Sequence, residues 1–272
     1  MLVMAAAVLW STGGLFIKWT TLSAYQLSFW RSLLAVLTVA IFTRREGFGL
    51  NPITIVTSVL YAALLLLFVV ATKLTTAANA IFLQYTAPIY VLILEPLFYK
   101  EKFRRADLFT VMACIAGMTL FFVGKLQPQD ISGNLTALAS GVCFASYILL
   151  LRHSRSQQVN RASSVIYGNL LLVIVLAPAG LAAIPVMTTH DVLAVSYLGI
   201  VQIGIAYTLF TLGMARGVRS LEAGIVGYIE PVLNPVWVFL VLHERPSQWA
   251  LIGGAIIISA VLSHTVWGRR RS

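Results

Sequence analysis

The chain has 272 residues, of which 59% are hydrophobic and only 10% are charged, whereas about a quarter of a soluble domain is charged. This composition excludes an ordinary water-soluble globule. The net charge of +10 would suggest a nucleic-acid partner for a soluble protein. Here the basic residues lie between apolar runs, where they act as topology signals, so we expect no nucleic-acid partner.

Ten apolar runs follow one another along the chain, each long enough to cross a bilayer at about 20 residues per crossing. The first run lacks a basic leader, contains Trp10 and is followed at once by another run. We therefore predict a retained helix there rather than a signal peptide. The runs cover residues 2–20, 24–42, 53–72, 76–98, 106–124, 134–151, 163–184, 191–214, 220–243 and 248–268.

The basic residues of the connections indicate the orientation. If the N-terminus is cytoplasmic, fourteen Lys and Arg residues fall in cytoplasmic connections and the C-terminal tail, whereas only Lys18, Lys73, Lys125 and Arg245 fall outside. The excess on one side predicts that both termini are inside. Since another number of crossings would scramble this alternation, the charges also favour ten.

The second half of the chain matches the first at an offset of 143 residues. The matched pairs are Ala80 and Ala223, Tyr85 and Tyr228, Pro88 and Pro231, Glu101 and Glu244, Lys102 and Arg245, Leu108 and Leu251, and Ile115 and Ile258. The offset indicates that a five-helix unit has been duplicated. Because five is an odd number, the second copy crosses the membrane in the opposite sense to the first. We predict an all-α integral membrane protein of ten transmembrane helices in two inverted five-helix repeats, residues 1–125 and 126–272.

At this point the chain resembles a known family. The segment from Ala78 to Lys102, which contains Tyr85-Thr86-Ala87-Pro88, looks like the fourth helix of the ten-helix drug/metabolite transporter superfamily, EamA type. The segment from Tyr228 to Arg245 is similar to the ninth helix, and Trp10-Ser11 and Phe29-Trp30-Arg31 also match the family pattern. The resemblance covers essentially the whole chain and implies a secondary transporter. The family includes exporters of amino acids and other metabolites, as well as carriers for sugars, choline and nucleotide sugars.

The sequence contains no pattern typical of an enzyme or a metal centre. Its nine acidic residues form no close cluster, its four histidines lie near the ends of different runs, and Cys114 and Cys143 both lie inside apolar runs. A Gly-rich phosphate loop and a Gly-x-Ser-x-Gly elbow are both missing from the sequence. We therefore predict no catalytic residues, no metal and no cofactor. Since no ATPase motif is present, we expect transport to be driven by a solute gradient, a proton or another coupling ion.

Two charged residues lie deep inside predicted helices. An ionised carboxylate at the depth of Glu230 costs about 3 kcal/mol or more unless it is paired or hydrated. Glu230 either braces the backbone freed by Pro231 or faces substrate, and Arg31 either clamps carbonyl groups or contacts substrate. The two side chains can form an intramembrane pair if their helices are neighbours. Nearer the cytoplasmic end, Glu95 is expected to snorkel or to pair with the basic loop that follows it.

The matched prolines are candidate kink positions. Pro88 and Pro231 each remove an amide donor, so the fourth and ninth helices are expected to bend at matching depths and to leave a midplane cavity between them. The alternative is that both kinks are tolerated without a function. Side chains suited to an amphipathic solute lie at comparable depths: Trp10, Gln84, Tyr85, Tyr147, Tyr207, Tyr228 and Glu230.

These observations predict a multi-pass secondary transporter of a bacterial inner membrane. The expected activity is export of small amphipathic metabolites such as amino acids, by alternating access at a midplane cavity. An uptake carrier for choline-like cations or nucleotide sugars is the alternative within transport. A membrane enzyme or a non-transporting scaffold is the alternative outside it.

Overall fold

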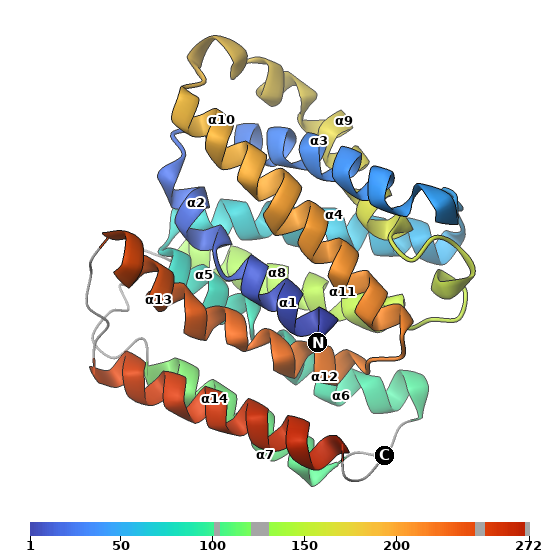
Figure 1. Cartoon of the computed structure of the whole chain (residues 1–272), viewed down its shortest axis with the longest axis vertical. Helices are drawn as coiled ribbons and strands as arrows, with labels where there is room; N and C mark the ends of the chain where they lie inside the picture. The colour runs from blue at the N-terminus through green and yellow to red at the C-terminus, as the bar shows by residue number, and fades with distance from the viewer. Residues whose placement is uncertain (101–103, 121–130, 243–247, 270–272) are drawn as a thin grey trace.

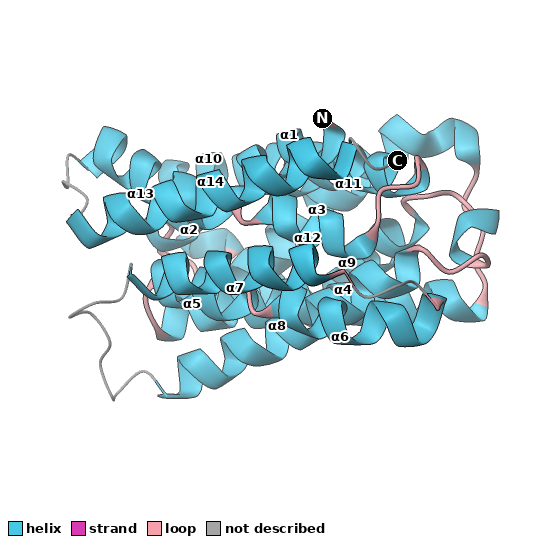
Figure 2. Cartoon of the chain, turned by 90° about the horizontal axis from the view of Figure 1, so that it is seen from below, coloured by secondary structure: helices cyan, strands magenta, loops and turns pink. Residues whose placement is uncertain are grey.

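The computed structural model describes residues 1–100, 104–120, 131–242 and 248–269. These residues form helices joined by short connections, with no strand among them, which confirms the all-α class (Figure 2). Four residues of the repeat motif, Glu101, Lys102, Glu244 and Arg245, lie outside the described ranges.

Each of the ten predicted runs contains helix. The helices of the first half are α1 (Leu2–Trp10), α2 (Gly13–Trp19), α3 (Ala24–Thr43), α4 (Pro52–Leu74), α5 (Ala77–Gln84), α6 (Ala87–Tyr99) and α7 (Arg105–Leu120), with a short 3-10 turn η1 (Arg44–Glu46). The second half has α8 (Ile131–Leu151), η3 (Ser156–Gln158), α9 (Ser163–Leu181), η4 (Ile184–Val186), α10 (Thr189–Ser196), the π-helix η5 (Tyr197–Ile205), α11 (Ala206–Ala215), α12 (Ser220–Gly227), α13 (Ile229–Leu242) and α14 (Gln248–Arg269).

Polar residues at the helix starts explain several boundaries. Ser23 forms a capping box with Gln26 before α3, and Thr188 forms one with Asp191 before α10. Asn51 accepts a hydrogen bond from the Thr54 amide and is followed by a proline in the first turn of α4. These side chains accept hydrogen bonds from backbone donors that a helix start leaves free. Each helix can therefore begin directly after a short connection.

Seven helical stretches of the described chain are long and apolar enough to cross a membrane. They are Leu2–Trp19, Ala24–Glu46, Pro52–Leu74, Asn79–Tyr99, Ile131–Leu151, Ser163–Leu181 and Thr189–Ala215. A shorter apolar helix covers Leu251–His264. The predicted runs at 106–124, 220–243 and 248–268 each include or adjoin residues outside the described ranges. The count of ten crossings therefore stays a prediction.

The helices pack as a bundle with a shared long direction (Figure 1). In the body of the bundle α3 packs on α9, and α4 packs on α8 and α9, while α7 and α14 form a pair at one edge. Large apolar side chains cover the outside, for example Leu97 and Phe109, which are 73% and 72% exposed. An apolar exterior around a bundle with buried polar groups is typical of a protein surrounded by lipid.

The N-terminus and the C-terminal part of α14 lie at one end of the bundle. Met1 and His264, close to the two termini, line the same surface pocket. We call this the termini end, and the end that carries Asp191 at the start of α10 the opposite end.

Candidate substrate cavity

Three of the helical stretches are interrupted near their middle. The first breaks between α1 and α2 at Ser11 and Thr12, the fourth at Tyr85 and Thr86, and the ninth at Tyr228. Pro88 and Pro231 are the second and third residues of the helices that follow, so each lies in a first turn, where a missing amide donor is tolerated. The interruption thus falls just before each proline of the matched pair.

A neighbouring helix approaches the break in the fourth stretch closely. A Cβ atom on Gly141 of α8 would lie 2.8 Å from the Gln84 carbonyl oxygen and 3.1 Å from that of Leu83. Only glycine leaves room for this approach. The Gln84 side chain also joins the two helices, because its Nε2 donates to Ser140 Oγ at 2.7 Å, and Ser140 Oγ donates to the Leu64 carbonyl at 2.9 Å.

A small cavity of about 30 Å³ lies beside these breaks. One water needs about 10–15 Å³ of such space, so in this conformation the cavity has room for a few water molecules and not for a metabolite. The cavity is lined by Trp10, Arg31, Leu64, Leu65, Phe68, Gln84, Tyr85, Phe144, Gln202, Tyr207 and Glu230. Of the side chains expected from sequence to bind substrate, Trp10, Gln84, Tyr85, Tyr207 and Glu230 are therefore brought together, with Arg31 beside them.

The other two expected side chains pack behind the cavity lining. Tyr147 stacks at a tilt on Tyr61, with ring centroids 5.2 Å apart, and Tyr228 packs on Tyr85 at 5.7 Å. Both tyrosines are fully buried, and the Tyr228 hydroxyl has no hydrogen-bond partner among the described residues. Tyr147 and Tyr228 support the wall rather than form it.

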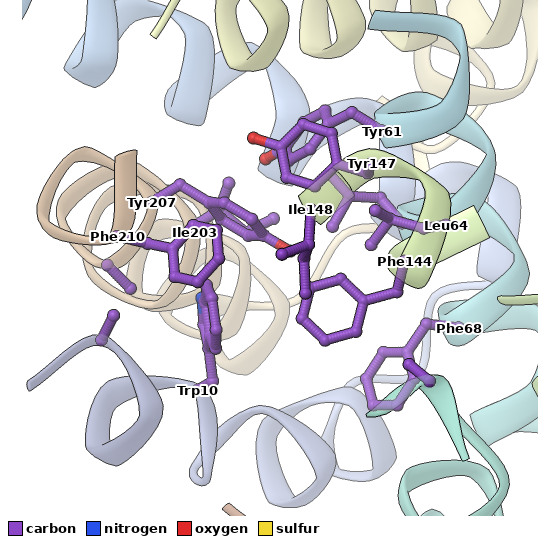
Figure 3. Packing of buried hydrophobic residues seen from close by; sticks show 14 of the residues in the cluster. Trp10, Tyr61, Leu64, Phe68, Phe144, Tyr147, Ile148, Ile203, Tyr207 and Phe210 are labelled. Atoms are coloured by element: carbon purple, nitrogen blue, oxygen red, sulfur yellow. The ribbon is translucent and has the colours of Figure 1, made fainter. Parts of the chain in front are cut away.

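Aromatic rings make up one wall of the cavity. Trp10 packs on Tyr207 at 4.7 Å, on Phe210 at 5.1 Å and edge-on against Phe144 at 6.2 Å between ring centroids. Figure 3 shows these rings converging from α1, α8 and α11. A wall of this kind offers flat apolar faces to a solute.

Glu230 is the carboxylate of the cavity. Its side chain is buried, and Oε2 accepts a hydrogen bond of 2.7 Å from the Tyr85 hydroxyl. Among the described residues it has no cationic partner.

Arg31 lies on the same cavity but bonds elsewhere. One terminal nitrogen donates to the Leu65 carbonyl at 2.9 Å, and the side chain is 1% exposed. In the described part of the chain no ion pair joins Arg31 to Glu230. Arg31 and Glu230, which were expected to pair, therefore line the same cavity but have different hydrogen-bond partners. Arg31 binds a backbone carbonyl of α4.

Sequence reasoning missed Gln202. It lies 7% exposed on the π-helix η5 and lines the cavity. A π-helix has more residues per turn than an α-helix, so Gln202 and Tyr207, five positions apart, turn toward the same side. One signal was available, because Gln202 is the only amide side chain in the run 191–214. The register shift itself has no sequence signature that we could have used.

A second buried carboxylate anchors a charge network near the termini end. Glu95 of α6 accepts from Arg152 at 2.7 Å and from the Ser220 amide at 2.9 Å, and it pairs with Arg219 at 3.4 Å. Arg219 also reaches Asp107 at 3.6 Å, and Asp107 contacts His264 at 2.8 Å. We call these residues the Glu95 network. These partners of Glu95 come from the second half of the chain, whereas residues 101–103 of the basic loop expected from sequence lie outside the described residues.

The described residues contain no group of three or more His, Cys, Asp or Glu side chains placed to hold a metal ion. What the cavity offers instead is one cation, one carboxylate, two amides and several aromatic faces. Side chains of these kinds can bind and orient a solute.

The fold and the cavity define a multi-pass helical membrane protein with a polar site inside the bundle. The model of the EamA-like transporter family matches residues 1–123 and 131–265. The chain therefore belongs to the EamA-like transporter family and is a membrane transporter.

Several curated relatives align over most of the chain. The pseudopaline exporter CntI of Pseudomonas aeruginosa (strain UCBPP-PA14) is 25% identical over 89% of this chain and 86% of its own. The aromatic amino acid exporter YddG of Ancylobacter novellus is 28% identical over 74% and 71%. A crystal structure of another protein superposes with a TM-score of 0.79, covering 99% of this chain and 97% of that one at 23% identity, and shows that the fold is shared.

Proposed function

We propose that this protein exports small amphipathic metabolites, such as amino acids, across a bacterial inner membrane by alternating access at the central cavity. The observation that carries the proposal is the cavity itself: a buried cation, a buried carboxylate and aromatic rings meet where three interrupted helices come together. The relatives named as exporters favour the outward direction. One of these, in Streptantibioticus cattleyicolor, is named a probable terminal-alkyne amino-acid exporter and is 27% identical over 72% of this chain and 67% of its own.

The helix contacts support two inverted five-helix repeats. The packing of α4 on α8 has a counterpart in α11 on α1, and that of α4 on α9 in η5 on α3. The contacts of α5 and α6 with α8 correspond to those of α12 and α13 with α1, while the pairs α3–α9 and α7–α14 are their own counterparts. Such an exchange pattern is expected if a twofold axis relates the halves, as in carriers that rock one repeat against the other.

Groups at the two ends are suited to act as gates. At the termini end the Glu95 network ties α6, α7, α8, α12 and α14 together. At the opposite end Asp191 accepts hydrogen bonds of 2.6 Å from the Thr20 hydroxyl and 2.8 Å from the Thr21 amide, and Lys73 donates to the Thr20 carbonyl at 2.8 Å. With both sets closed, the cavity between them has room for only a few water molecules. Release of one set at a time would open the cavity to one side.

Flux measurements test the proposal directly. The purified protein is reconstituted in liposomes, and a metabolite panel selected by thermal stabilisation is measured for efflux. Stabilising solutes are expected to cross faster than in empty liposomes, and the flux is expected to fall in the Trp10→Ala variant but not in Trp19→Ala, which replaces an exposed tryptophan. Stabilisation without flux would contradict transport and favour a scaffold, and conversion of the solute to a new product would favour an enzyme.

A further inference from the structure

We infer that the central cavity holds its solute by a carboxylate group, which binds between the side chains of Arg31 and Trp10. The inference rests on the proposal that this cavity is the transport site, and it adds the chemical class of the solute and the two groups that select it.

Unused hydrogen-bond donors are the first step. Arg31 Nε and Trp10 Nε1 are buried, and neither has a hydrogen-bond partner among the described residues. Buried donors are paired in the great majority of cases, so two that line one cavity call for an acceptor that the empty cavity does not supply. The Arg31 terminal nitrogen that bonds the Leu65 carbonyl fixes the guanidinium in place.

The positive charge of Arg31 also favours a carboxylate as the bound group. The side chain of Arg31 keeps its positive charge under all ordinary conditions, and in the described part of the chain its only hydrogen-bond partner is a neutral carbonyl. A guanidinium and a second N–H donor on the same cavity match the charge and the acceptor groups of a carboxylate. An ammonium group in the same position would be repelled, so a choline-like cation does not fit this part of the cavity.

Other lining residues offer hydrogen-bond acceptors to the rest of the solute. Glu230 has one oxygen bonded to Tyr85, and the amide oxygen of Gln202 has no partner among the described residues. These groups suit the donor end of a solute, such as an ammonium. Gly13, at the break in the first helical stretch, leaves room for the Gln202 side chain, because a Cβ atom there would come within 2.6 Å of its amide nitrogen. A carboxylate at Arg31 and an amine toward Glu230 together describe an amino-acid zwitterion.

The pocket at the termini end has matching chemistry. Its volume is about 620 Å³, and its lining includes three arginines, Arg104, Arg216 and Arg219, against one acid, Glu222. A concave surface with an excess of one charge concentrates solutes of the opposite sign. A vestibule of this kind would collect carboxylates at the end predicted to face the cytoplasm.

A series of paired solutes tests the inference on the full-length protein. L-phenylalanine, L-leucine and L-methionine are each compared with the corresponding amide, which keeps the side chain and the amine and lacks the carboxylate. Kd is measured by thermal stabilisation and by calorimetry. We expect the acid of each pair to bind at least about tenfold more tightly than its amide, a ratio typical of one lost charge-assisted hydrogen bond.

Trp10→Phe is the decisive variant, because it removes one N–H donor and keeps an aromatic ring. It is expected to raise Kd for the acids about tenfold and Kd for the amides by much less, because the N–H bond to an ionised acceptor is the stronger one. Trp30→Phe is the matched control, since the Trp30 indole donates to the Gly180 carbonyl at 3.0 Å, away from the cavity. Arg31→Met removes the guanidinium and is expected to abolish the preference for the acids. If this variant fails to fold, Arg31→Lys, which keeps the charge and loses the Nε donor, is used in its place and is expected to reduce that preference.

The outcomes separate this inference from the proposed function. Equal binding of acid and amide, an equal effect of Trp10→Phe on both, or stabilisation by none of the three acids at millimolar concentration would overturn the carboxylate site. If the acids bind selectively and none crosses the membrane, the carboxylate site stands and the transport function fails.

Discussion

Two buried carboxylates, Glu95 on α6 and Glu230 on α13, have opposite surroundings. Glu95 is 1% exposed and accepts from two arginines and a backbone amide. Glu230 is 5% exposed and accepts from a single tyrosine hydroxyl. A buried charge surrounded by cations is already compensated, so its removal affects mainly stability. Glu230 has no cationic partner among the described residues, so its carboxylate can bind a positive group of a solute. This favours a role in binding.

The largest expected effect is on the stability of Glu95→Gln. The substitution leaves Arg152 and Arg219 without a carboxylate between them, and breaking a buried ion pair costs about 3–5 kcal/mol. We expect a clear drop in the thermal unfolding temperature in detergent. Glu46→Gln is the control, because Glu46 pairs with Arg161 where its side chain is 33% exposed, and partly exposed pairs contribute about 1 kcal/mol or less. Equal stabilities of the two variants would contradict a structural role for Glu95.

Glu230→Gln is expected to show the reverse pattern. The amide can still accept from Tyr85, so the unfolding temperature should stay close to that of the parent protein, while flux of the best substrate should fall at least about tenfold, as expected for a lost charge-assisted contact. Liposome flux and thermal unfolding are measured on the same preparation. A large loss of stability that is rescued in the double variant with Arg31→Met would instead indicate a structural ion pair.

A smaller effect is expected from Gly141→Ala. The added methyl group would overlap the Gln84 carbonyl oxygen, 2.8 Å from the new Cβ, and overpacking of this kind costs about 1–3 kcal/mol. Because Gln84 lines the cavity, both the unfolding temperature and the Kd for substrate should change. Ser146→Ala on the same helix, whose hydroxyl bonds only the Val142 carbonyl within that helix, should change neither. An unaltered Kd in Gly141→Ala would separate the helix break from the site.

The two matched tyrosines give the finest comparison. Tyr85→Phe removes the hydroxyl that bonds Glu230 and should change Kd by several-fold, since a net hydrogen bond is worth about 1 kcal/mol. Tyr228→Phe removes a hydroxyl without a partner and should leave Kd unchanged. Isothermal titration of one solute against both variants is sufficient. Equal changes in Kd would mean that the rings, not the hydroxyl, govern binding.

Much of the architecture could be predicted from the sequence. Apolar runs and basic connections are patterns over many residues, so a single residue does not change them. The same holds for most of the cavity lining: Trp10, Gln84, Tyr85, Tyr207 and Glu230 were found by looking for polar and aromatic side chains at similar depth. That reasoning also selected Tyr147 and Tyr228, because depth alone does not reveal the direction of a side chain around its helix.

The remaining features depend on register and on long-range contacts. Gln202 reaches the cavity through a π-helical stretch, whose energy differs too little from that of an α-helix to leave a mark in the residue pattern. Glu95 was expected beside the loop that follows it in sequence, and its partners Arg152 and Arg219 lie 57 and 124 positions away. Only the packing of α6 between α8 and α12 brings them together.

The small volume of the central cavity also has an electrical consequence. With room for only a few water molecules, the cavity by itself is too small to hold a column of water that spans the bundle. Arg31 and Glu230 line this cavity, and each charge moved across a whole membrane exchanges about 2.3 kcal/mol per 100 mV. If the cavity is the transport site, a solute that crosses it as a zwitterion, with no net charge, is expected to move independently of the voltage.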